Sequence, residues 1–187
     1  MGFLNNLFGG KKDQAFTAAS DLMPEDQFWK IIHSSYKKAK GDFEVQQEVL
    51  DSELQQLSPQ DVLLFDNKFR KLRGEAYTWE LWGAAYIING GCSDDYFIDF
   101  RDWVIAKGKE FYVRTLSDPE TLADVDRAKI EVEWEGIGYV PMTVFKEMTG
   151  EEMPAGYAEN VEVTGEEWDE DNDDLKNRFP LLWAKYS

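Results

Sequence analysis

A chain of 187 residues with 43% hydrophobic and 14% aromatic residues can bury one sizeable core, so we expect a single folded domain with short appendages. Acidic side chains (37) outnumber Lys and Arg (20), and the net charge of -17 opposes direct binding to nucleic acid or to anionic lipid. One cysteine and one histidine exclude an internal disulfide framework and leave few ligands for zinc. We therefore predict no cofactor and no metal site.

Residues 1–23 are predicted to be an N-terminal attachment, either flexible or docked. Their short apolar stripe, FLNNLF, lacks the leading positive charges and the continuous apolar core of a secretory signal. The longest apolar run of the chain, LWGAAYII, is far shorter than the roughly 18 to 20 residues that cross a bilayer. We expect a cytoplasmic protein with no stable membrane insertion.

Residues 24–154 are the expected helical globular domain. Pro24 suits the first turn of a helix that ends at Gly41, and a second apolar stripe follows between Phe43 and Leu57. Ser58-Pro59 then predicts the N-cap and first position of a third helix. Because the connections are short, neighbouring helices should pack antiparallel.

A fourth helix is expected over about Glu75 to Ile88 and a fifth over about Asp94 to Lys107. Between them, Asn89-Gly90-Gly91 tolerates the positive φ angles of a helix stop, and Ser93 can cap the next helix. Further on, Pro119 predicts another helical turn, and the alternation of Ile130, Val132 and Trp134 is typical of a strand. A last helix is expected to end at Gly150.

The predicted fold class is therefore mainly α: a compact multi-helix single domain with short antiparallel helix connections, plus an acidic C-terminal extension over residues 155–187. Residues 151–175 carry eleven acidic side chains and no Lys or Arg. The apolar FPLLW end should dock on the helices. The run DEDNDD resembles an EF-hand start, but Asp174 and Pro180 occupy the required glycine and glutamate positions, so it predicts no specific metal site.

The junction between the fourth and fifth helices is one candidate site, a possible pocket. Its residues are Trp82, Asn89, Cys92, Asp94, Asp95 and Asp99. Carboxylates there could act as an acid/base pair or with a metal, which defines the enzyme alternative. The neighbouring aspartates, however, oppose thiolate formation at Cys92, and a helix stop followed by a helix start accounts for the same residues.

The acidic extension is the second candidate, as a surface for a basic protein partner. Its candidate residues are Glu166, Glu167, Asp169, Glu170, Asp171, Asp173 and Asp174. The preferred function is a non-catalytic binding module, and a toxin-neutralising immunity protein is its most concrete version. Solvation of the chain would also account for the acidity.

A family resemblance rests on the stretches EDQFWKIIHSSY, LSPQDVLLFDNKF, AYTWELWGAAYIINGGCSDDYFIDFRDWVIAKGKEFY and VFKEMTGEEMP. Together they resemble the bacterial domain of unknown function numbered as family 4240, over Met23 to Pro154. The resemblance implies a mainly α-helical domain and no assigned activity. The N-terminal attachment and the acidic extension, which ends in FPLLWAKYS, lie outside it.

Overall fold

The computed structural model describes residues 21–126, 136–169 and 172–187, and the regular elements in these ranges are helical. Their bounds are α1 (Glu25–Ala39), α2 (Phe43–Leu54), α3 (Pro59–Glu75), α4 (Trp79–Asn89), α5 (Asp94–Ala106), α6 (Lys109–Ser117), η1 (Pro119–Asp124), η3 (Ile137–Tyr139), α7 (Val140–Thr149), α8 (Asn172–Arg178) and α9 (Pro180–Tyr186). The predicted mainly α fold class is confirmed. Within these ranges, β pairing is limited to one isolated parallel bridge between Thr78 and Thr164.

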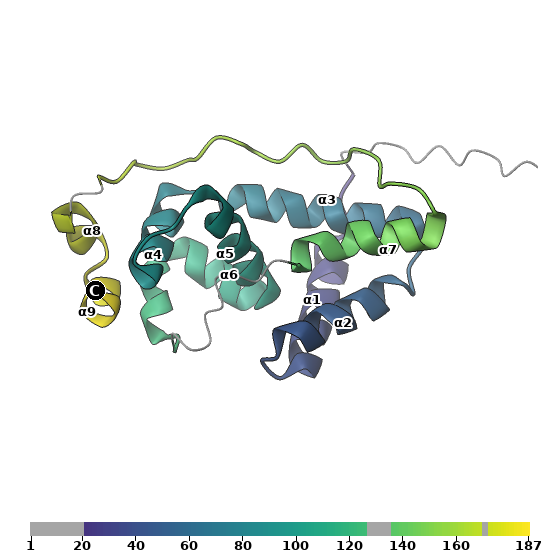
Figure 1. The fold of residues 1–187 in the computed structure, drawn as a ribbon, viewed down its shortest axis with the longest axis horizontal. Coiled ribbons are helices and arrows are strands. Elements are labelled where there is room, and N and C mark those ends of the chain that lie inside the picture. Colours follow the sequence, from purple (N-terminus) through teal and green to yellow (C-terminus); the bar gives the residue numbers. More distant parts are fainter. Residues whose placement is uncertain (1–20, 127–135, 170–171) are drawn as a thin grey trace, which may run out of the picture.

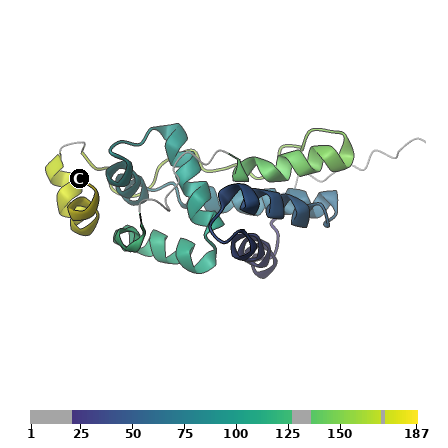
Figure 2. The same cartoon turned by 60° about the horizontal axis from the view of Figure 1, so that its bottom comes forward.

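Helix α3 connects the two groups of helices that make up the molecule. It contacts α1, α7 and α5, and α5 in turn contacts α4 and α6. Figure 1 shows α1, α2 and α7 at one end of the molecule and α4, α5 and α6 at the other, with α3 reaching across both groups. The turned view in Figure 2 separates α7 from the pair α1 and α2.

Side-chain caps and one glycine set the helix ends that the sequence predicts. Ser58 Oγ accepts the Asp61 N–H (3.1 Å) at the start of α3, and Ser93 Oγ accepts the Tyr96 N–H (3.4 Å) at the start of α5. Gly90 ends α4 with a φ of 69°, which glycine adopts without steric cost. The helix stop and helix start predicted from NGGCSDD are confirmed.

The expected start of the fourth helix at Glu75 is wrong, because Glu75 ends α3. Helix α4 begins at Trp79, and Thr78 Oγ1 caps it by accepting the Leu81 N–H at 3.1 Å. The backbone between the two helices pairs elsewhere: the Trp79 N–H donates to the Thr164 carbonyl oxygen at 2.8 Å. A periodicity argument cannot detect this pairing, since the partner lies far along the chain.

Two expectations fall wholly or largely on residues that the structure does not describe. These are the strand-like alternation of Ile130, Val132 and Trp134 and most of the N-terminal attachment. Met23, the last residue of that attachment, is docked: its side chain is buried and its N–H donates to the Leu64 carbonyl oxygen at 3.0 Å. The helix expected to end at Gly150 does so, with a φ of 77° at the glycine.

Aromatic side chains dominate the core. Trp103 is completely buried and Trp29 nearly so, and Trp79 and Trp82 pack against the core while half-buried. Trp103 contacts Phe111 edge to face, at a centroid distance of 5.2 Å. Each of these tryptophans lies in a segment whose apolar residues recur with helical spacing, which is the pattern of a buried helix face.

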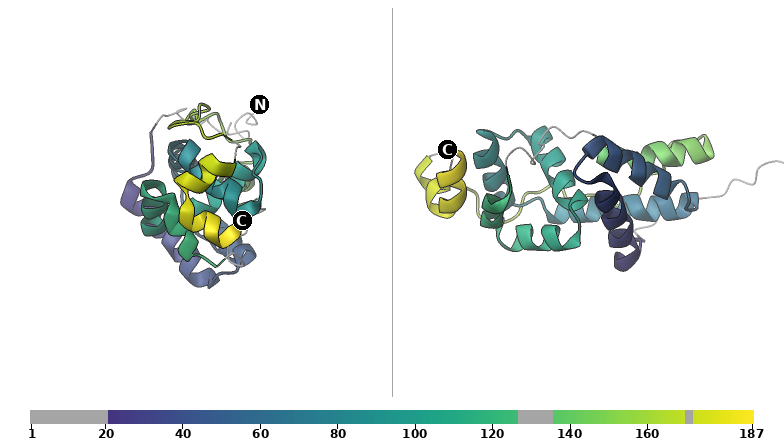
Figure 3. Two further views of the ribbon diagram at one scale, coloured as in Figure 1. Left: turned by 90° about the vertical axis from the view of Figure 1, so that its left-hand side faces the viewer. Right: turned by 90° about the horizontal axis from the view of Figure 1, so that it is seen from below.

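Residues 151–169, which we call the C-terminal strap, follow α7 without forming a helix. Figure 1 shows the strap running back along α3 to α8 and α9 at the opposite end of the molecule. The end-on view in Figure 3 shows α8 and α9 in front of the remaining helices. There α9 packs on α4 and η1, with Leu182 buried and the Glu120 carboxylate accepting the N–H groups of Leu181 (3.0 Å) and Leu182 (3.2 Å).

Candidate functional site

The junction of α4 and α5 brings Trp82 and Cys92 together. The Trp82 Nε1–H donates to the Cys92 carbonyl oxygen at 3.0 Å. The indole also stacks on Trp79 and on Phe97, at centroid distances of 5.4 and 5.0 Å. Trp82 therefore ties the turn between the two helices to an aromatic column.

The Cys92 thiol is held in its protonated form. Burial is the main cause that raises its pKa to about 12, and Asp94 adds to the rise while Arg101 and the hydrogen bond from Trp82 oppose it. The single histidine, His33, is exposed on α1. Because a cysteine nucleophile reacts as its thiolate, this environment works against nucleophilic chemistry at Cys92.

The other junction residues divide between the surface and the interior. Asp94 and Asp95 are exposed in the first turn of α5, where carboxylates favour the positive end of the helix, and Asp99 is half-buried. Asn89 closes α4, and its buried Nδ2 has no acceptor among the described residues. Across the described ranges, no group of three or more His, Cys, Asp or Glu side chains is arranged to hold a metal ion.

The partner-binding candidates lie where the strap turns into α8. Among the described ones, the exposed side chains are those of Glu166, Glu167, Asp169 and Asp173. Asp174 is half-buried and accepts from Arg178 Nε at 2.9 Å. Glu170 and Asp171 lie outside the described residues.

Arg178 fixes the backbone of this turn. Its Nη1 and Nη2 donate to the carbonyl oxygens of Glu166 and Glu167, both at 2.9 Å, and the Asp174 carboxylate accepts the Asp169 N–H, also at 2.9 Å. The Glu166 side chain nevertheless stays 86% exposed. We call Glu166, Glu167, Asp169 and Asp173 together the acidic surface.

Trp168 anchors the strap next to this surface. Its ring is buried against the edge of Trp79 (centroid distance 5.8 Å) and against Tyr86 (5.0 Å). The approach requires a glycine on α4, because a Cβ built on Gly83 would lie 3.2 Å from Trp168 Cδ1 and 2.8 Å from Phe179 Cε2. A single aromatic side chain thus fixes the strap over α4.

Backbone hydrogen bonds fasten the strap at two further points. The buried Asn67 side chain on α3 accepts the Tyr157 N–H at 2.7 Å. Beyond it, the Thr164 N–H donates to the Tyr77 carbonyl oxygen at 3.0 Å and completes the bridge with Trp79. The strap is therefore bonded through its main chain both to α3 and to the segment between α3 and α4.

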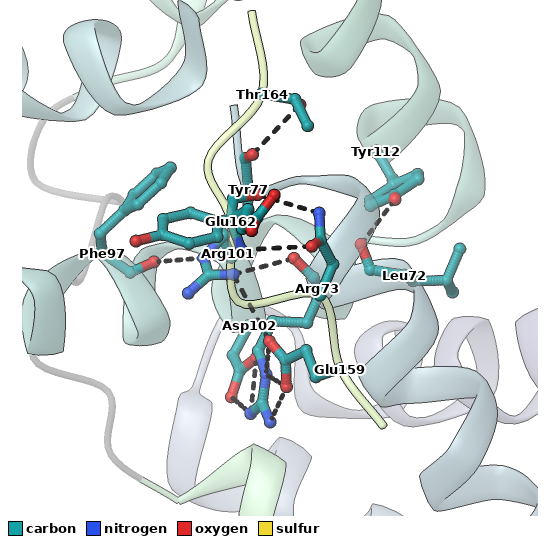
Figure 4. A network of polar contacts seen from close by, with 11 residues as sticks. Leu72, Arg73, Tyr77, Phe97, Arg101, Asp102, Tyr112, Glu159, Glu162 and Thr164 are labelled. Carbon is teal, nitrogen blue, oxygen red and sulfur yellow. Dashed lines mark hydrogen bonds and ion pairs between the residues drawn. The ribbon is translucent and has the colours of Figure 1, made fainter. Parts of the chain in front are cut away.

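Between these points, Glu159 of the strap enters a cluster of charged side chains that the sequence reasoning missed (Figure 4). Arg73 on α3 donates to Glu159 through Nε (3.0 Å) and Nη2 (2.7 Å), and through Nη1 to Asp102 on α5 (3.2 Å). Arg101 Nη1 lies 3.5 Å from Glu159 and also donates to the Arg73 carbonyl oxygen at 3.0 Å. We call Arg73, Arg101, Asp102 and Glu159 the charged cluster.

Burial shifts the pKa values of two members of the charged cluster, Asp102 and Arg101. Desolvation raises the pKa of Asp102 to about 7, against the opposing effect of Arg73 and Arg101. Desolvation also lowers the pKa of Arg101. Arg101 further lies over the rings of Tyr77 and Phe97, 4.5 and 4.9 Å from their centroids.

A weak sequence signal for the cluster exists. Arg73 follows the inward-facing Phe69 by one helical turn, and Arg101 follows Phe97 in the same way, so both arginines occupy positions where the helix faces the core. A charged residue at such a position needs a buried partner. The partner Glu159 cannot be deduced, because it lies in the strap.

We expect the wild-type free energy of unfolding to fall as the pH rises from about 5 to about 7.5, and the Asp102→Asn variant to lack most of this slope. A carboxyl whose pKa is raised on folding, here to about 7, binds its proton more tightly in the native state. Below the ordinary pKa of an aspartate this stabilisation is complete. It is lost between that value and the folded-state pKa of about 7, where the free energy of unfolding falls by up to about 1.4 kcal/mol per pH unit.

Urea unfolding at closely spaced pH values measures this slope. Asp95→Asn, an exposed change on the same helix, is the control and should keep the wild-type slope. Parallel profiles for wild type and Asp102→Asn would contradict the assignment.

The comparisons with known proteins identify the family. The family model described as "Protein of unknown function (DUF4240)" matches residues 23–147, which is more than half of the chain, and the chain belongs to this family. Neither a curated protein nor a solved structure matches the chain. No helix in the described part combines the length and the apolar character needed to span a bilayer.

Proposed function

We propose that the chain is a non-catalytic, cytoplasmic protein-binding module whose acidic surface engages a basic protein partner. An immunity protein that neutralises a basic toxin is the most concrete form of this proposal. Nucleic acid is not the proposed partner, because the charge of the chain repels phosphate.

One observation carries the proposal: the acidic surface is exposed but held in place. Trp168 buries its ring on α4, and Arg178 bonds the backbone of Glu166 and Glu167. A fixed array of carboxylates loses less conformational freedom on binding than a flexible acidic tail does. It can also steer a basic partner toward one orientation.

Parallel affinity captures and calorimetric titrations test the proposal. The wild-type chain and a variant with Glu166→Gln, Glu167→Gln, Asp169→Asn and Asp173→Asn are used as baits on the native cell lysate. A basic protein retained by the wild type and lost with the variant is then purified and titrated. We expect the four changes to weaken its binding by about tenfold or more, and added salt to weaken wild-type binding steeply.

A matched control removes four exposed charges elsewhere, with Asp26→Asn, Glu44→Gln, Glu48→Gln and Glu110→Gln on α1, α2 and α6. This control should bind the partner like the wild type. If both variants lose affinity equally, overall charge rather than the acidic surface drives binding. If neither loses affinity and salt has no effect, the proposal is wrong.

A further inference from the structure

We propose that the face of the helical body beneath the strap is a receptor for an extended acidic peptide, and that the strap is its occupant in cis. The face consists of Asn67, Arg73, Gly74, Tyr77, Gly83 and Arg101, which we call the receptor face. The proposed partner in trans is an extended, acidic protein segment that carries a glutamate and, further along, a tryptophan. This proposal concerns a second surface and does not depend on the acidic surface.

The contacts of the strap are those of a bound peptide. Its main chain pairs with Tyr77 and with the Asn67 side chain, as an added strand pairs with an exposed backbone edge. Its Glu159 carboxylate receives two N–H groups of Arg73, a geometry that guanidinium groups use to recognise carboxylates. Main-chain bonds, one charge and one aromatic anchor are the usual parts of peptide recognition.

Two helical glycines leave room for an extended chain. A Cβ on Gly74 would lie 3.1 Å from the Asn160 backbone nitrogen, and a Cβ on Gly83 would crowd Trp168. Glycine inside a helix costs roughly 0.5–1 kcal/mol relative to alanine. The strap gives Gly74 a steric reason, whereas at Gly83 Trp168 shares that role with Phe179 and Leu175, whose atoms lie 2.8 and 3.2 Å from the added Cβ.

The receptor face lies inside the range that the family model matches, and the strap lies beyond it. All six residues of the receptor face lie within residues 23–147, the range that the family model matches, whereas Glu159 and Trp168 lie beyond it. Both arginines and Asn67 thus lie within the matched domain, and this chain covers them with a segment from beyond it. A separate segment of the same chemistry would compete for them.

A fluorescent synthetic peptide of residues 155–169 tests the proposal by anisotropy titration against the full chain. The chains compared are the wild type and the double variant Glu159→Gln/Trp168→Ala, in which the cis strap has lost its charged and aromatic contacts. We expect at least about tenfold tighter binding to the double variant, because a site occupied in cis shows a reduced apparent affinity. If the double variant does not fold, Glu159→Gln alone serves in the same comparison.

Two controls fix the interpretation. Glu162→Gln removes one exposed strap charge outside the charged cluster and should bind the peptide like the wild type. A peptide carrying Gln in place of Glu159 should bind the double variant at least about tenfold more weakly than the unmodified peptide does, because it offers Arg73 no charge.

Hydrogen exchange of residues 156–164 is measured on the same samples. Absence of peptide binding to a double variant whose strap exchanges freely would overturn the proposal, since the face would then accept the strap only as part of the fold. Unchanged exchange protection in the double variant would also overturn it, because Glu159 and Trp168 would then not be what holds the strap.

Discussion

Replacing Arg73 with methionine is expected to lower the free energy of unfolding by about 3–5 kcal/mol, the usual cost of removing one partner from a buried ion pair. Arg73 donates to Asp102 and Glu159 at once, and Asp102 is only 4% exposed. Methionine fills similar space but leaves both carboxyl groups without this guanidinium. Urea denaturation near neutral pH measures the effect.

Lys71→Met provides the control. Lys71 lies on the same helix and pairs with Glu75 at the surface, where such pairs contribute about 0–1 kcal/mol. Similar losses in the free energy of unfolding for Arg73→Met and Lys71→Met would show that the charged cluster stabilises the fold no more than a surface ion pair does.

Trp168→Ala is expected to produce the second large effect, a loss of about 3–5 kcal/mol by analogy with other buried tryptophans. The change removes the side chain that packs on Trp79, Tyr86 and Gly83. Scanning calorimetry should show the loss, and exchange of the backbone N–H groups at Glu166 and Glu167 should accelerate.

Trp168→Phe separates packing from hydrogen bonding. The buried Trp168 Nε1–H has no acceptor among the described residues, so phenylalanine loses only part of the ring contact. We expect a cost clearly smaller than that of alanine. An equal cost for both substitutions would mean that the indole nitrogen makes an essential contact.

The helical body follows from local sequence patterns. Ser58, Ser93 and Gly90 mark helix ends through short-range hydrogen bonds and backbone angles, and these effects can be deduced from a few neighbouring residues. Trp103 lies on an apolar stripe, so its burial was also predictable. The start of α4 was misplaced because Thr78 pairs with the distant Thr164.

The candidate sites were harder to predict, because they depend on contacts between distant segments. Glu159 meets Arg73 and Arg101 only when the strap folds back along α3, and periodicity says nothing about the course of an extended segment. The junction at Cys92 was a candidate site because of its composition. The hydrogen bond from Trp82 to the Cys92 carbonyl oxygen instead gives its turn a structural role. Candidate acidic residues could be named from composition, whereas the role of Arg178 in fixing them could not.

Site-resolved hydrogen exchange of the wild-type chain tests the central claim most directly, that the strap is a fixed part of the molecule. The amide of Tyr157 donates to Asn67 and the amide of Thr164 donates to Tyr77. Both should exchange at least about a hundredfold more slowly than in an unstructured peptide of the same sequence. Exchange of both amides at the rate of the free peptide would contradict the account, since neither the acidic surface nor the receptor face would then be held as described.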